Sequence, residues 1–144
     1  MATCTPQEEP GLDKDQVTLI RNSFTKVAPI APQAAELFYN RLFELDPSVR
    51  PLFKGDTAEQ GRKLMAMIAT AVANADNLPA VAPAVRELGA RHVGYGVRPE
   101  HYAIVGATLL WTLEKGLGDA FTAPCRAAWT ALYGAVAAVM QMGA

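Results

Sequence analysis

The chain has 144 residues, of which 51% are hydrophobic and 19% are charged, and its formal net charge is −1. This size and balance fit one compact domain that buries a sizeable core. The 13 basic and 14 acidic residues are spread along the chain, which argues against a nucleic-acid-binding surface and against a polybasic membrane patch.

The N-terminus has neither the basic nor the apolar region of a signal peptide, and the longest apolar run, residues 131–140, is too short to span a bilayer. We therefore expect a cytoplasmic protein with no membrane association. The polar start of the chain predicts a flexible tail over residues 1–12 and a single domain over residues 13–144.

Apolar residues recur at three- and four-residue spacings and no segment alternates, which predicts an all-α domain. Asp13 with Gln16 fits a capping box that opens the first helix, and Asp46-Pro47 ends the second. The expected helices, in chain order, cover about residues 13–27, 32–45, 57–76, 77–92, 99–117 and 122–140, with a short helical turn at 47–53.

The chain has only two histidines, and one of them closes an apolar helical stripe formed by Val81, Val85, Leu88 and His92. A neutral imidazole on such a face either finds a local hydrogen-bond partner or ligates a metal. The spacing alone leaves both open. His101 stands at a predicted helix start, and we expect its side chain to be exposed.

The two cysteines, Cys4 and Cys125, are far apart and form no Cys-x-x-Cys pair, which argues against a zinc site and against covalent haem attachment. We expect Cys4 to be a free thiol in the tail and Cys125 to be buried or partly buried. An intermolecular disulfide is the alternative.

Several segments resemble bacterial single-domain globins and the haem domain of flavohaemoglobins. Residues 37–43, Asp46-Pro47 and Leu52-Phe53 resemble their second helix and the corner after it, and Leu88-Gly89-Ala90-Arg91-His92 resembles their proximal segment. The run from Val105 to Val136 also resembles neuroglobin. The resemblance covers about residues 13–140 and implies a globin fold, a three-over-three helical sandwich around haem b.

The resemblance assigns roles to individual residues. It makes His92 the proximal ligand of the haem iron and Phe53 the aromatic side chain that packs on the haem plane. It makes Tyr39 and Gln60 the distal residues that face a bound gas. The further cofactor contacts that it implies are Phe43, Lys63, Leu64, Met67, Leu88, Val97, Tyr102 and Val105.

The distal pair has competing interpretations. Gln60 stands where oxygen-storage globins and neuroglobin carry histidine, so the bis-histidine coordination of neuroglobin is not expected from this position. Thr57 and Gln60 also fit a capping box, which would turn the amide toward the backbone. Tyr39 fits an ordinary core residue on an inward stripe with Ala35 and Phe43. Lys63 either reaches a haem propionate or is solvated.

The proximal side departs from the flavohaemoglobin pattern. Tyr102 matches a tyrosine that approaches the proximal histidine there, but the glutamate that accompanies it late in the last helix is missing. No carboxylate follows Asp119. We therefore expect His92 to lack a charged partner, which argues against peroxidase-like chemistry.

The resemblance predicts a haem protein that binds O2 reversibly and with high affinity, with NO and CO as further ligands. Together with Tyr39 and Gln60, it also predicts NO dioxygenase capability. Because the chain has no Gly-x-Gly-x-x-Gly motif, electrons would come from a separate reductase. A haem-based gas or redox sensor that acts through a partner protein is the alternative, and a haemless regulatory module is the third. We expect a monomer or a weak dimer.

Overall fold

The computed structural model describes residues 12–52, 57–94 and 96–142, and in these ranges the chain forms helices joined by short turns and loops, with no strand. The all-α prediction is confirmed for these residues. The six α-helices are α1 (Lys14–Val27), α2 (Ala31–Leu45), α3 (Thr57–Ala73), α4 (Ala82–Gly94), α5 (Pro99–Leu117) and α6 (Ala123–Met142). Short 3₁₀ turns cover Ala28–Ile30, Pro47–Leu52, Leu78–Val81 and Gly118–Ala120.

The helix ends follow from local capping chemistry. At the start of α1, the Gln16 amide donates to the Asp13 carboxylate (2.7 Å) and the Asp13 amide donates to the Gln16 side chain (3.2 Å), which confirms the predicted capping box. The Cys125 amide donates to the Thr122 hydroxyl at the start of α6 (3.3 Å). Gly118, with φ of +57°, ends α5 in a conformation that side chains rarely adopt.

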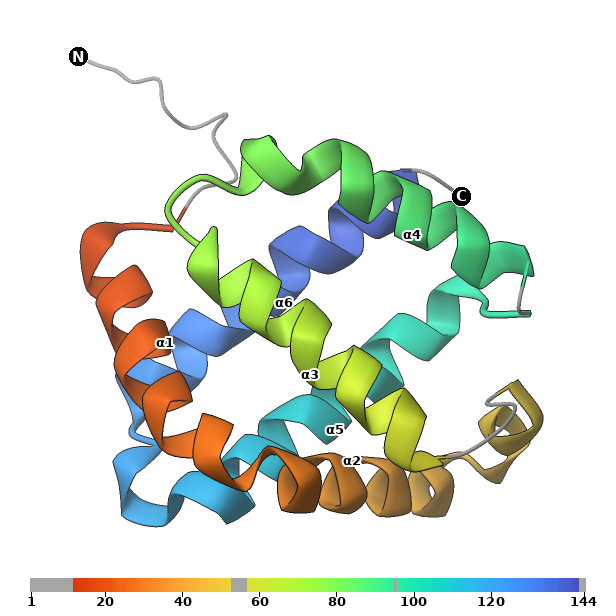
Figure 1. Cartoon of the computed structure of the whole chain (residues 1–144), viewed down its shortest axis with the longest axis horizontal. Coiled ribbons are helices and arrows are strands. Elements are labelled where there is room, and N and C mark those ends of the chain that lie inside the picture. Colours follow the sequence, from red (N-terminus) through yellow and green to blue (C-terminus); the bar gives the residue numbers. More distant parts are fainter. Residues whose placement is uncertain (1–11, 53–56, 95, 143–144) are drawn as a thin grey trace.

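The helices pack in two crossed groups (Figure 1). α2 lies against α3 and α5, whereas α6 lies against α1 and α4. α3 crosses the middle of the view in front of α5 and α6. α4 therefore depends on α6 for most of its packing.

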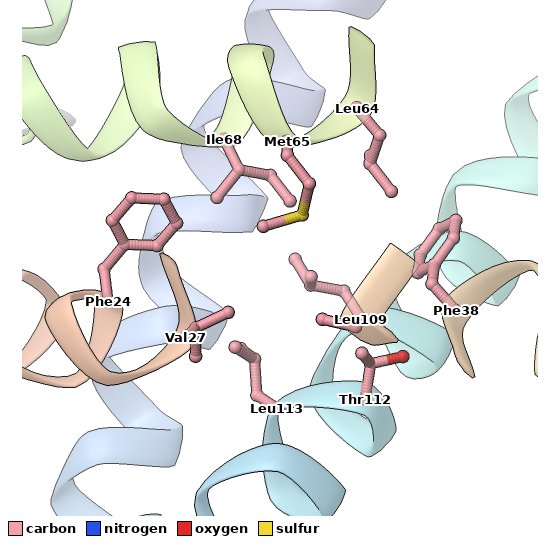
Figure 2. A pocket seen from close by; sticks show the side chains of 10 residues that line it. Phe24, Val27, Phe38, Leu64, Met65, Ile68, Leu109, Thr112 and Leu113 are labelled. Atoms are coloured by element: carbon pink, nitrogen blue, oxygen red, sulfur yellow. The ribbon is translucent and has the colours of Figure 1, made fainter. Parts of the chain in front are cut away.

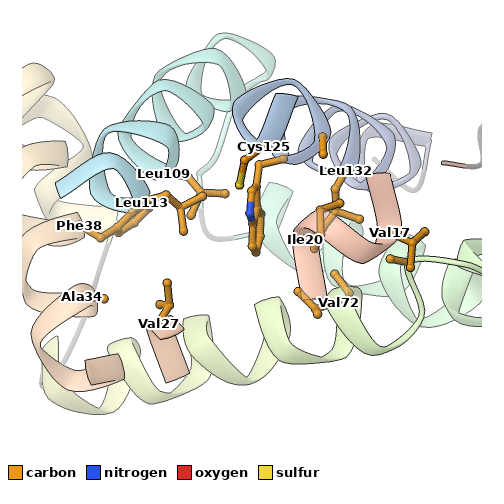
Figure 3. Close-up of a cluster of buried hydrophobic side chains, with 14 of the residues drawn as sticks. Val17, Ile20, Val27, Ala34, Phe38, Val72, Leu109, Leu113, Cys125 and Leu132 are labelled. Carbon is orange, nitrogen blue, oxygen red and sulfur yellow. The ribbon is translucent and has the colours of Figure 1, made fainter. Parts of the chain in front are cut away.

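The largest fully buried side chain, Trp129 of α6, ties the core to α1. Its indole N–H donates to the Ser23 hydroxyl (2.8 Å), which itself donates to the Leu19 carbonyl (2.8 Å). Trp129 belongs to a core cluster of buried apolar side chains from α1, α2, α3, α5 and α6, part of which is drawn in Figure 3. The indole N–H is buried without a loss of hydrogen bonding, which keeps the cost of its burial small.

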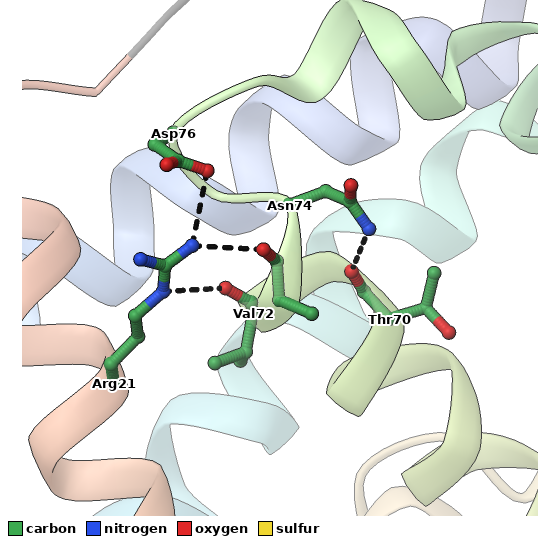
Figure 4. A network of polar contacts seen from close by, with 6 residues as sticks. Arg21, Thr70, Val72, Asn74 and Asp76 are labelled. Atoms are coloured by element: carbon green, nitrogen blue, oxygen red, sulfur yellow. Dashed lines mark hydrogen bonds and ion pairs between the residues drawn. The ribbon is translucent and has the colours of Figure 1, made fainter.

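A second polar contact joins α1 to the end of α3 (Figure 4). The Arg21 guanidinium donates to the carbonyls of Val72 (3.2 Å) and Ala73 (2.8 Å) and pairs with Asp76 (3.0 Å). The last carbonyls of a helix have no partner within it, so a cation at this place both satisfies them and suits the helix dipole. The contact therefore stabilises the C-terminal end of α3. No described helix is long and apolar enough to cross a membrane.

Candidate functional site

His92 lies in the last turns of α4 with its imidazole half-buried. Its Nδ1 is 2.8 Å from the carbonyl oxygen of Leu88, one helical turn earlier. Because a carbonyl only accepts, this hydrogen bond puts the proton on Nδ1 and the lone pair on Nε2. Burial also lowers the pKa of His92, which favours the neutral ring. A neutral imidazole with its Nδ1–H anchored is the form in which histidine binds a metal.

Tyr39 of α2 contacts the backbone of Gln60 on α3. The Tyr39 hydroxyl donates to the backbone carbonyl of Gln60 (3.2 Å). The Tyr39 ring stacks on Phe43, with centroids 6.0 Å apart, and only 6% of its surface is exposed. Burial raises the pKa of Tyr39 to about 12, so the phenol keeps its proton and remains a donor at neutral pH.

A glycine brings α2 and α3 close enough for this contact. A Cβ atom added at Gly61 would lie 2.8 Å from the Cβ of Ala35, so no larger residue fits without a shift. Gly61 follows Gln60 directly, and Ala35 precedes Tyr39 by one turn. Sequence analysis missed the role of Gly61, because a glycine within a helix carries no signal of the helix that it faces.

The predicted apolar contacts share an intermediate burial. They are half-buried, in contrast to the closed core around Trp129, and they come from α2, α3, α4, α5 and the segment before α5: Phe43, Leu64, Met67, Leu88, Val97, Tyr102 and Val105. Apolar side chains left partly exposed by several helices are typical of a wall that a large apolar ligand covers. Phe53 lies outside the described residues.

Two cavities are each lined by one of these side chains. A cavity of about 140 Å³ is lined by apolar side chains of α3, α4 and α6 and by the 3₁₀ turn before α4, and it includes Met67. A smaller one of about 20 Å³ lies between α1, α2, α3 and α5 and is lined by Leu64 and Phe38 (Figure 2). The smaller cavity has room for little more than one water molecule.

The donor set fits a haem better than a bare metal ion. Within the described ranges, no group of three or more His, Cys, Asp and Glu side chains could hold an ion. His92 offers a single nitrogen beside half-buried apolar side chains, and an iron porphyrin needs one axial nitrogen and an apolar wall. Lys63 is exposed and lies 3.9 Å from Glu59 of the same helix, which agrees with the solvated interpretation of this side chain.

The prediction that the His101 side chain is exposed is wrong. Its side chain is buried, with 7% of its surface exposed, and its Nδ1 accepts a hydrogen bond from the Arg98 amide (3.0 Å). His101 is the third residue of α5, and its side chain caps the start of the helix by accepting this hydrogen bond. The sequence contained the information needed to predict this cap. Pro99 marks the first turn of a helix, and His101 stands three residues after the N-cap, where a side-chain acceptor completes a capping box.

Tyr102 makes a contact that the sequence did not predict. Its carbonyl accepts a hydrogen bond from the buried hydroxyl of Tyr133 on α6 (2.6 Å). The Tyr133 ring lies over Gly106, where a Cβ would approach the ring to 2.7 Å. The hydrogen bond to Tyr102 and the close approach to Gly106 together join α6 to α5. Cys125 is buried, as expected, with a free thiol.

Comparisons with known proteins agree with this arrangement. A family model described as Globin matches residues 36–140. The chain is 36% identical to a neuroglobin of Dissostichus mawsoni, over 91% of each chain. It is 34% identical to a flavohemoprotein of Vibrio cholerae, over 85% of this chain, and spans about a third (32%) of that protein's length. A solved bacterial globin from Campylobacter jejuni superposes with a TM-score of 0.78 at 29% identity, over 88% of this chain and 91% of the other.

Proposed function

The chain belongs to the globin family, which implies a haem cofactor and small gas ligands such as O2, and from that membership we propose that it binds O2 reversibly and tightly and oxidises NO when an external reductant is present. We propose haem b as the cofactor, held by His92 Nε2. Phe43, Leu64, Met67, Leu88, Val97 and Val105 would form its apolar wall.

When bound, a haem supplies an iron centre that takes up diatomic gases reversibly. The residues of this chain would determine how slowly a bound gas dissociates. O2 in such a site carries partial negative charge, so the Tyr39 hydroxyl and the Gln60 amide would act as charge-assisted donors to it, worth about 1.5–3 kcal/mol each. Both would slow the release of O2.

The observation that carries this proposal is the contact between Tyr39 and the Gln60 backbone. It holds a protonated phenol on the side of α3 that bears Gln60. At 3.2 Å this hydrogen bond is long for a hydroxyl donor. Rotation about the phenol C–O bond exchanges it for a stronger bond to a charged acceptor, with no movement of the ring.

NO oxidation would follow from the same pocket. The overall reaction, NO + O2 + e⁻ → NO3⁻, consumes one electron per turnover. We propose that this electron comes from a separate reductase or a small reductant in the cytoplasm, and that the globin acts as a monomer or a weak dimer. This part extends to the chain a chemistry suggested by its likeness to the haem portion of a flavohemoprotein.

The rate of O2 release tests the proposal. We expect Tyr39→Phe and Gln60→Leu each to accelerate release tenfold or more, since a tenfold change corresponds to about 1.4 kcal/mol. Tyr133→Phe is the matched control, because it removes another buried hydroxyl that donates to a backbone carbonyl. NO consumption would then be measured with a chemical reductant. Release rates that are unchanged in both distal variants would contradict the proposal.

A further inference from the structure

α4 approaches the backbone of α6 very closely at Gly89, which is buried. A Cβ atom at this position would lie 2.6 Å from the carbonyl carbon and 2.7 Å from the Cα of Met140, and closer still to the Met140 carbonyl oxygen. These are backbone atoms, which cannot turn aside as the end of a flexible side chain can. Only glycine fits here with the two helices where they are.

The contact lies about one helical turn before the histidine. Gly89 precedes His92 by three residues on α4, and the imidazole of His92 is anchored to the carbonyl of the residue before Gly89. Besides Gly89, the only buried residue of α4 is Val85. The position of the α4 backbone, and with it that of the imidazole, therefore depends on how closely the helix approaches α6.

The backbone of Met140 limits how closely α4 can approach α6. The side chain of Met140 is buried, with 8% of its surface exposed, although it lies in the last turn of α6.

We propose that Gly89 is a positioning residue, whose missing side chain lets α4 rest on the Met140 backbone and so sets the depth at which His92 meets the haem. This inference rests on the proposed haem site. An alanine at residue 89 must move α4 away from α6 by a substantial part of an ångström before ordinary contact distances return. The imidazole would move with the helix.

The test compares Gly89→Ala with Gly94→Ala, a control on the same helix where an added Cβ meets nothing within 4 Å. We expect Gly89→Ala to accelerate haem transfer to an acceptor protein at least tenfold and to shift the iron–histidine stretching band of the ferrous protein. The control should change the transfer rate less than twofold and leave the band in place.

A second background separates positioning from general packing. In His92→Gly with added imidazole, the axial ligand is no longer attached to α4. Adding Gly89→Ala to this background should then change haem transfer less than twofold. An equal acceleration in both backgrounds would mean that Gly89 acts through packing alone, and the proposal would be wrong.

A crystal structure of haem-free Gly89→Ala gives a readout that needs no cofactor. We expect α4 and His92 to be displaced from α6, with the last turn of α6 unchanged. If that last turn yields and α4 stays in place, the positioning role is overturned. Failure of the wild-type protein to take up haem would instead refute the proposed function, while the crystal structure would still decide the role of Gly89.

Discussion

The Tyr39 phenol makes one contribution to the pH dependence of stability at alkaline pH. Its pKa is raised to about 12 by burial, whereas an exposed tyrosine titrates near 10. A raised pKa means that the stabilisation is fully present below pH 10 and is lost as the pH rises from 10 toward 12, because the unfolded chain then releases a proton that the folded chain retains.

We therefore expect the wild-type protein to lose stability relative to Tyr39→Phe above pH 10, by up to about 1.4 kcal/mol per pH unit. Urea unfolding between pH 8 and pH 11.5 measures this difference. Tyr133→Phe serves as a comparison, since burial raises the pKa of Tyr133 as well. A stability difference between wild type and Tyr39→Phe that stays constant over this range would contradict the burial of the phenol.

At the scale of single residues, the sequence predicts more about chemistry than about packing. Apolar spacing predicts inward positions for His92 and Tyr39; in the structure Tyr39 is buried and His92 is half-buried. Their roles toward a haem remain predictions. His101 was misjudged because a polar residue near a helix start looks solvated, whereas its ring accepts a backbone hydrogen bond and is buried by doing so.

At the scale of helices, the boundaries were largely predictable and the close approaches were not. Prolines and capping residues act locally, so the start of α1 and the end of α5 can be read from a few residues. The cost of a glycine within a helix also depends on local structure. The packing contact that requires the glycine, in contrast, can involve a residue far away in the chain. Gly89 faces a residue 51 positions later in the chain, and no local pattern contains that partner.

Gly61 provides a test of such an approach. In Gly61→Ala, the added Cβ lies 2.8 Å from the Cβ of Ala35, a rigid atom attached to the α2 backbone. We expect a net loss of about 1–2 kcal/mol, because overpacking costs more than the better helix propensity of alanine returns. Gly134→Ala, where a Cβ meets nothing within 4 Å, should instead gain about 0.5–1 kcal/mol. Urea unfolding of both variants measures these changes.

The double variant Gly61→Ala with Ala35→Gly checks the cause. Removing the Ala35 Cβ makes room for the new one, so the two substitutions together should cost less than the sum of their separate effects, by 1 kcal/mol or so. Strict additivity would mean that the loss comes from elsewhere than the contact between α2 and α3.

On the scale of the whole molecule, stability is distributed unevenly. α1, α2, α3, α5 and α6 contribute to the core that contains Trp129, whereas α4 buries only Val85 and Gly89 and borders the cavity of about 140 Å³. Leu88 and His92 of α4, both of them half-buried, belong to the proposed haem site. A helix that buries so little against its own protein depends on the ligand for the rest of its stability.

We therefore expect haem to stabilise α4 selectively. In the haem-free protein, the amides of α4 should exchange with deuterium much faster than those of α1. Haem at 100 times its dissociation constant adds about 2.7 kcal/mol, and in α4 this should appear as slower exchange by a factor of about 100. Hydrogen exchange followed by mass spectrometry, with and without haem, measures both helices in one experiment. In His92→Gly, haem should protect α4 less while leaving α1 as it was. Uniform protection of both helices would show that α4 is held by the core alone, and that the link through His92 contributes nothing to its stability.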